Sequence, residues 1–253
     1  MTAPRPFIHQ KFNGEIWRLE IDEATATLLL EIRNESEKLV SYASVNLNSG
    51  KLNFSDYTTP ERWLTGIETA YNGVLLLHNY QSENGPAHKA ITAVDAITAE
   101  TLWNNYTLAF DHLAVNGPIV YNAQLLPKKL FLANIKTGTM IRPYNEAIDI
   151  EYTKNITVPE VLTTGQLEML KLPAVPYGDF IHYLEYNNFR IVSLHTHNNQ
   201  LLQQHLYILN DTGVIYEDLL NTSIQKIQPE AFVLHKNWLI CLKNKTELLV
   251  LNI

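Results

Sequence analysis

Acidic, aromatic and histidine side chains recur where buried strands are predicted to begin in this sequence. Acids, aromatic rings and imidazoles are the groups that a sugar or another small polar ligand meets in a protein site. If the fold brings these strand starts to one face, the side chains line the mouth of a central channel. Ordinary loop polarity with aromatic packing is the alternative explanation. The candidate ligand-binding residues are Trp63, Asp111, His112, Asp149, Tyr177, Asp179 and His182.

Three of these residues, Asp111, Asp149 and Asp179, are carboxylates that could act as a pair. Glycoside hydrolysis needs two carboxylates flanking one bond, ~5–5.5 Å apart in retaining enzymes and ~6.5–9.5 Å apart in inverting ones. Such a pair is geometrically possible, because the three acids enter successive predicted strands or their loops. No motif supports it, so we assign no catalytic residue and keep a carbohydrate-active enzyme as the alternative function.

His195 and His197 form a close histidine pair. Residues i and i+2 of a strand share a face, so both imidazoles could reach one metal ion, with His205 across the predicted turn. No third ligand is evident nearby, so we interpret the pair as a surface feature at a strand end and predict no metal site. Other histidines are scattered without a partner in sequence: His9, His78, His88 and His235.

The sequence has one cysteine, Cys241, which excludes an internal disulfide and a cysteine-based zinc site. Cys241 lies in an apolar run that is typical of a buried strand, so it is not expected to be a nucleophile. Glycine-rich nucleotide-binding loops, the nucleophile elbow, the His-Glu-x-x-His zinc motif and the EF-hand loop are all absent from the sequence. No cofactor is therefore predicted.

The composition is that of a globular chain with a sizeable core: 253 residues, 46% hydrophobic and 18% charged, with a net charge of −7. The negative charge argues against nucleic acid or an anionic membrane as the main partner. The first residues do not read as a secretory signal, and the longest apolar run is far shorter than the ~20 residues of a membrane span. We therefore expect a cytoplasmic protein that binds an unknown protein or a small polar ligand.

Short apolar runs bounded by Asn, Gly, Asp and Thr dominate the chain and predict strands. One strand–turn–strand segment recurs, with Gly50, Gly138 and Gly213 at the turn and Ala99 in one copy. Glycine suits a tight turn because it adopts positive φ without strain. The copies span residues 41–54, 90–103, 130–141 and 206–216.

A second pair of predicted strands precedes each repeated hairpin, so each unit is a four-stranded antiparallel meander, as in a propeller blade. We predict an all-β, five-bladed β-propeller that forms a single domain over residues 1–253, with six degenerate blades as the alternative. The last blade would take its outer strand from the N-terminus, around residues 6–12, which closes the ring. The predicted blades are 15–58, 62–107, 108–146, 178–222 and 229–253 with the N-terminal strand.

Residues 147–177 do not fit the repeat and are predicted to be an insertion. Residues 160–170 within it are expected to form a short helix or a spare hairpin. A long insertion in a compact fold often carries function. A structural plug or a decayed blade is the alternative.

The repeated hairpin resembles that of quinoprotein-type (PQQ-like) β-propellers, in which a strand ending near Asp is followed by Thr-Gly and a strand ending in Trp. Residues 94–103 match best, with Asp95 and Trp103 at the family's positions. The strand layout also resembles an uncharacterised bacterial family of propeller-like proteins. The resemblance implies a propeller of the WD40, YVTN or PQQ-like kind, but no quinone, because the family's vicinal cysteine pair is missing. A non-catalytic binding or protein-interaction scaffold is the expected function.

Overall fold

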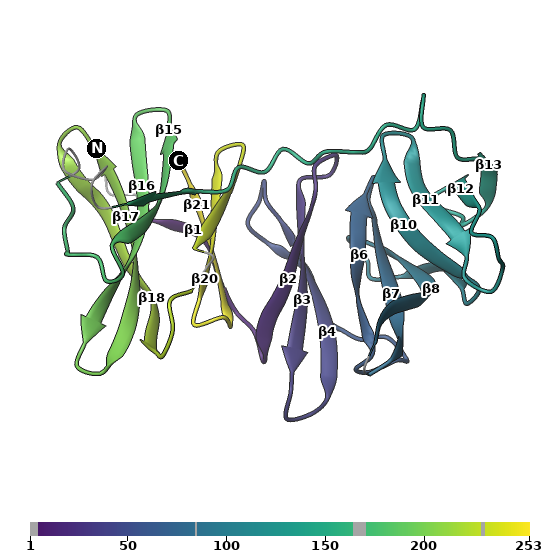
Figure 1. Cartoon of the computed structure of the whole chain (residues 1–253), viewed down its shortest axis with the longest axis horizontal. Coiled ribbons are helices and arrows are strands. Elements are labelled where there is room, and N and C mark those ends of the chain that lie inside the picture. The colour runs from purple at the N-terminus through teal and green to yellow at the C-terminus, as the bar shows by residue number, and fades with distance from the viewer. Residues whose placement is uncertain (1–4, 84, 164–170, 229–230) are drawn as a thin grey trace. The chain divides into compact units, whose positions relative to one another are not determined.

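The computed structural model describes residues 5–83, 85–163, 171–228 and 231–253, and in these ranges the chain is all-β (Figure 1). No helix in the described part of the chain is long and apolar enough to cross a membrane. The strands form five antiparallel sheets, and within each sheet consecutive strands pair with each other, except that β1 (Pro6–Lys11) pairs with β21 (Glu247–Asn252). The prediction of an all-β chain built from consecutive meanders is therefore confirmed.

The sheets fall into two compact units. One unit is continuous and spans Asn13–Lys154, whereas the other combines the N-terminal residues up to Phe12 with Asn155–Ile253. The chain therefore passes between the units twice.

The continuous unit contains three four-stranded sheets, which match the first three predicted blades. The first sheet contains β2 (Glu15–Asp22), β3 (Thr27–Asn34), β4 (Leu39–Asn46) and β5 (Leu52–Tyr57). The second contains β6 (Thr65–Tyr71), β7 (Val74–Ser82), β8 (Gly85–Asp95) and β9 (Thr101–Asn105). The third contains β10 (Leu108–Ala114), β11 (Gly117–Asn122), β12 (Leu130–Ala133) and β13 (Met140–Pro143).

The other unit contains two sheets. The larger one contains β14 (Glu160–Thr163), β15 (Phe180–Tyr186), β16 (Phe189–Asn198), β17 (Leu201–Asn210) and β18 (Gly213–Ile224). The smaller one contains β19 (Phe232–His235), β20 (Trp238–Lys243), β21 (Glu247–Asn252) and β1 (Pro6–Lys11). Strand β1 pairs antiparallel with β21, so the prediction that the N-terminal strand completes the last sheet is confirmed.

The predicted insertion contributes β14, a fifth strand that the repeat did not indicate. The expectation of a short helix is wrong over residues 160–163, because these residues pair with β15 from Glu160 opposite Tyr183 to Thr163 opposite Phe180. The rest of that predicted element, residues 164–170, lies outside the described residues.

Alternating burial explains why the second sheet is covered on both faces. Val74 and Leu76 of β7 belong to a core shared with the third sheet, whereas Leu75 and Leu77 belong to a core shared with the first sheet. Successive side chains of a strand point to opposite faces, so an unbroken apolar run such as Val74–Leu77 indicates a strand that is buried on both sides.

The repeated hairpins share one turn chemistry. The side-chain oxygens of Asn46, Asp95, Asn134 and Asn210 each accept a hydrogen bond from a backbone N–H two residues further along. Such Asx turns replace backbone hydrogen bonds at a reversal of the chain. The position predicted to need glycine does have positive φ, including +63° at Ala99. The repeat seen in the sequence is therefore a repeat of turn geometry.

Trp103 of β9 packs on the hairpin turn of the next sheet. Its indole N–H donates to the carbonyl oxygen of Ile135 at 2.8 Å. A Cβ atom on Gly138 would lie only 2.7 Å from the indole ring. The tryptophan that ends the family-like repeat therefore acts in packing between consecutive sheets.

Candidate functional site

The residues predicted to line a channel mouth are divided between the two units. Trp63, Asp111, His112 and Asp149 belong to the continuous unit, and Tyr177, Asp179 and His182 belong to the other. Two surface hollows, of about 210 and 640 Å³, are lined by none of these seven residues. Convergence of the seven side chains on one site therefore stays a prediction.

Asp149 is held in a dense set of hydrogen bonds. Its carboxylate is buried and accepts two bonds of 2.6 Å from the guanidinium of Arg142. It also accepts bonds from the side chain of Asn116 and the backbone N–H of Asn145. The bonds from Arg142 outweigh the opposing effect of burial and hold the pKa of Asp149 far below its ordinary value. The carboxylate fixes the loop after β13 and is poorly placed to act as an acid catalyst.

Asp111 and His112 are neighbours on β10 at a β-bulge. The carboxylate of Asp111 lies 2.7 Å from Nδ1 of His112 and pairs with the ammonium of Lys128. Burial opposes ionisation, but the bonds from Lys128 and His112 lower the pKa of Asp111 overall. Both predicted carboxylates of this unit are thus already paired with cations.

Trp63 forms part of a stack of aromatic rings and cations. The guanidinium carbon of Arg33 lies 5.3 Å from its ring centre, and the ammonium of Lys38 lies 4.6 Å away. Arg33 also lies 5.5 Å from the ring of Trp17, which is 65% exposed. Cation–π contacts of this kind position long cationic side chains.

In the other unit, Tyr177 and Asp179 lie in the loop before β15, and His182 is buried on β15. The ring of Tyr177 packs edge-on against His197 at 4.7 Å, and its backbone N–H donates to the carbonyl oxygen of His195. Asp179 has a positive φ of 55°. Tyr177 and Asp179 thus lie at the end of a loop, whereas His182 lies within a strand.

The two histidines of the predicted pair differ in burial, so the interpretation of the pair as a surface feature is wrong for His195. His195 is buried and its Nε2 accepts a hydrogen bond from the backbone N–H of Gln228, whereas His197 is exposed. Burial, and then the charges of His182 and His205, lower the pKa of His195 to about 4. Cys241 is buried as predicted, and burial raises the pKa of its thiol.

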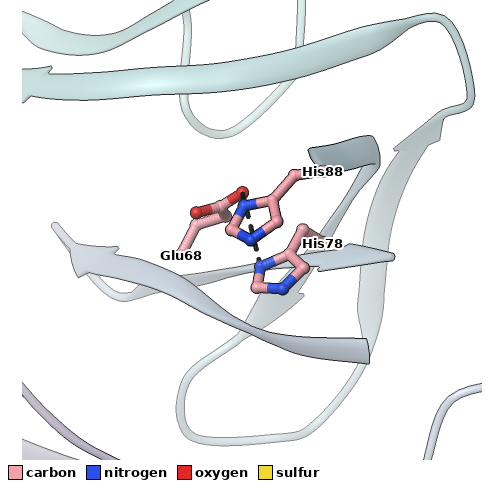
Figure 2. A group of neighbouring side chains, drawn as sticks. All are labelled: Glu68, His78 and His88. Atoms are coloured by element: carbon pink, nitrogen blue, oxygen red, sulfur yellow. Dashed lines mark hydrogen bonds and ion pairs between the residues drawn. The ribbon is translucent and has the colours of Figure 1, made fainter. Parts of the chain in front are cut away.

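A different cluster carries the chemistry of metal-ligating groups. In the described part of the chain, Glu68, His78 and His88 are the one group of three such side chains whose ligand atoms all lie within 4.8 Å of one another (Figure 2). Oε1 of Glu68 is 2.8 Å from Nδ1 of His88 and 3.3 Å from Nδ1 of His78. The two imidazoles are stacked, with ring centres 3.6 Å apart and planes 7° apart.

Two bulges bring these side chains together from three neighbouring strands. The register of β6 and β7 shifts between Ile67 and Thr69, so Glu68 is the extra residue of a bulge. The register of β7 and β8 shifts between His78 and Asn79, and Ala90 adopts a φ of +60° there. Bulges re-aim side chains and are over-represented beside functional sites.

Charged groups of the first sheet surround the cluster. Arg33 forms an ion pair of 2.6 Å with Glu31, and Arg18 forms one of 3.0 Å with Glu20. Arg18 also donates to the carbonyl oxygen of Glu68 at 2.9 Å. Each arginine is thus paired with a carboxylate of its own sheet, and the carboxylate of Glu68 contacts the two imidazoles.

His78 is the buried member of the cluster. Its side chain is 2% exposed, and neither ring nitrogen has a hydrogen-bond partner within the described residues. Burial, and then the charges of His88, Arg18 and Arg33, lower the pKa of His78 to about 3. His78 is therefore a neutral imidazole at pH 7, with a lone pair available for a ligand.

The sequence offered no spacing motif for this cluster, because the three residues lie on different strands. A signal was present in the alternation of side chains along β7 and β8. His78, Tyr80 and His88 share one face when Tyr80 pairs with His88, as it does. The bulges at Glu68 and Ala90 were not predictable, and they complete the cluster.

A family profile described as a domain of unknown function (DUF4905) matches residues 21–103, which include the whole cluster. Solved structures with weak similarity include the β-propeller domain of the Trilobed protease from Pyrococcus furiosus, at 9% identity and a TM-score of 0.34 over 94% of this chain and 65% of that one. Raptor from Chaetomium thermophilum matches at 9% identity and a TM-score of 0.42, over 99% of this chain and 29% of that one. Hydrazine synthase from Kuenenia stuttgartiensis matches at 13% identity and a TM-score of 0.27, over 88% of this chain and 60% of that one. No curated protein matches the sequence.

Proposed function

We propose that the chain is a non-catalytic, cytoplasmic scaffold of the β-propeller type that binds a protein partner through the segment 155–163. The observation that carries this proposal is exposed apolar surface on an extended segment. Val158 and Val161 are 63% and 60% exposed, and Ile156 is 37% exposed. Extended segments with exposed apolar side chains are one kind of surface to which a partner adds a strand.

The partner's contacting element is an extended apolar strand. Strand β14 lies at the end of its sheet, with β15 as its neighbour in the described residues. An edge strand offers backbone N–H and C=O groups to an added strand, and its exposed side chains supply specificity. The paired state of Asp111 and Asp149 favours this binding role over glycoside hydrolysis.

Site-specific photocross-linking tests the proposal. A benzophenone amino acid at Val158 should give one discrete adduct with another protein in cell extract, and Val161→Asp should abolish it. The matched control carries the same group at Leu126, which is 95% exposed in the other unit. Equal adducts at both positions, or an adduct of twice the chain's own mass, would contradict the proposal.

We also propose that the five sheets are blades of one ring. A compact domain of this length has a radius of gyration of about 18 Å. Small-angle X-ray scattering should give a value close to that figure for a closed ring. Two units that move independently on their two connecting segments would give a clearly larger one.

A further inference from the structure

We infer that Glu68, His78 and His88 form a binding site for one divalent transition-metal ion of the zinc class. The site is independent of the partner surface proposed above. Two imidazole nitrogens and one carboxylate oxygen form a donor set that suits borderline ions such as Zn²⁺ and Co²⁺.

The spacing of the donor atoms fits one ion. Two ligands of a tetrahedral ion with bonds of 2.0–2.1 Å lie about 3.3 Å apart. Oε1 of Glu68 already lies 3.3 Å from Nδ1 of His78 and 2.8 Å from Nδ1 of His88. An ion therefore requires the closer pair, Glu68 and His88, to open by about 0.5 Å. The ring of His88, the more exposed of the two imidazoles, would tilt out of the stack while His78 stays in place.

The protein preorganises the ligands. Each comes from a different strand of one sheet, and the ring of Tyr80 packs edge-on against both imidazoles, at 4.6 Å from His78 and 5.0 Å from His88. Rigid strands hold metal ligands more precisely than loops do. The strands β6, β7 and β8 thus hold one ligand each.

The burial of His78 points to a ligand. A buried polar group without a hydrogen bond costs free energy, and an ion bound to its nitrogen would offset that cost. Glu68 is 7% exposed at its side chain, so its negative charge is also poorly hydrated and gains from a cation. The side chain of His88 is 29% exposed, so ions can enter the site from solvent and water can complete the coordination.

Cobalt titration of the full chain, without a histidine tag and after dialysis against a chelator, tests the inference. The wild type should develop the visible d–d absorption of nitrogen- and oxygen-bound Co²⁺ with one equivalent, and Zn²⁺ should displace it. Glu68→Gln preserves the shape of the side chain, and His88→Ala alters a partly exposed position. Each should weaken binding by about tenfold or more.

Two controls keep the test specific. His197→Ala removes an exposed histidine of the other unit and should leave the titration unchanged. Zn²⁺ should raise the melting temperature of the wild type but not of Glu68→Gln, because an ion that binds only the folded state stabilises it. Absence of a Co²⁺ spectrum in the wild type, or equal affinity in Glu68→Gln, overturns the inference. Val158→Asp should bind Co²⁺ normally, which separates this site from the proposed partner surface.

Discussion

Gly66 lies directly opposite His78 in the β6–β7 ladder, and a Cβ atom on Gly66 would lie 2.9 Å from the imidazole Cε1 of His78. The ring cannot move aside easily, because His88 and Tyr80 pack against it. The missing side chain at position 66 therefore provides the space that His78 occupies.

Gly66→Ala should accordingly destabilise the fold by about 1–3 kcal/mol, the usual cost of overpacking a core. Urea denaturation followed by tryptophan fluorescence measures the change. Gly85→Ala is the matched control, because the nearest atom to its added Cβ is the hydroxyl oxygen of Ser82 at 3.2 Å, on a flexible side chain. Equal stability of the Gly66 variant and the wild type would show that the ring has room to shift.

Gly138→Ala should also be destabilising, by about 1–3 kcal/mol, because the new Cβ would overlap the ring of Trp103. The turn itself tolerates alanine, since Ala99 occupies the equivalent position with φ +63°. The control is therefore Ala99→Gly, which should change stability by about 1 kcal/mol or less. A Gly138 variant as stable as the wild type in thermal melts would argue against close packing of consecutive sheets.

Asp149 should make the continuous unit sensitive to acid. Its folded-state pKa is lowered, whereas an unfolded aspartate titrates near about 3.9. The stabilisation is therefore complete above about pH 5 and is lost as the pH falls toward the folded-state pKa. Melting temperatures of Asp149→Asn should fall less steeply than those of the wild type between about pH 5 and pH 3. Parallel curves would mean that the ion pair with Arg142 contributes nothing.

Removing residues 1–11 deletes β1 and should lower the melting temperature and promote aggregation. The deletion removes Ile8 from its position opposite Val250 and leaves β21 as an open edge of its sheet. Deletion of residues 1–5 is the matched control, since β1 begins at Pro6. Indistinguishable melting curves for the two deletions would show that β1 adds no stability.

Much of the fold was predictable because successive side chains of a strand alternate between the two faces of its sheet. The run Val74–Leu77 indicated a strand buried on both faces, and Gly50 and Gly138 marked the hairpin turns. The Glu68–His78–His88 cluster was not predictable, because one-residue bulges at Glu68 and Ala90 decide which side chains meet. A bulge changes the face on which every later side chain of a strand lies, and no composition signal marks these two.

The pairing of β1 with β21 has a consequence for the order of events during synthesis. All strands of the continuous unit, Asn13–Lys154, have emerged from the ribosome well before Glu247 is translated. Strand β1 precedes the continuous unit in the sequence but has no sheet to join until β21 emerges. The contact between them has a very long separation in sequence, which slows folding. The continuous unit should therefore fold before β1 pairs with β21.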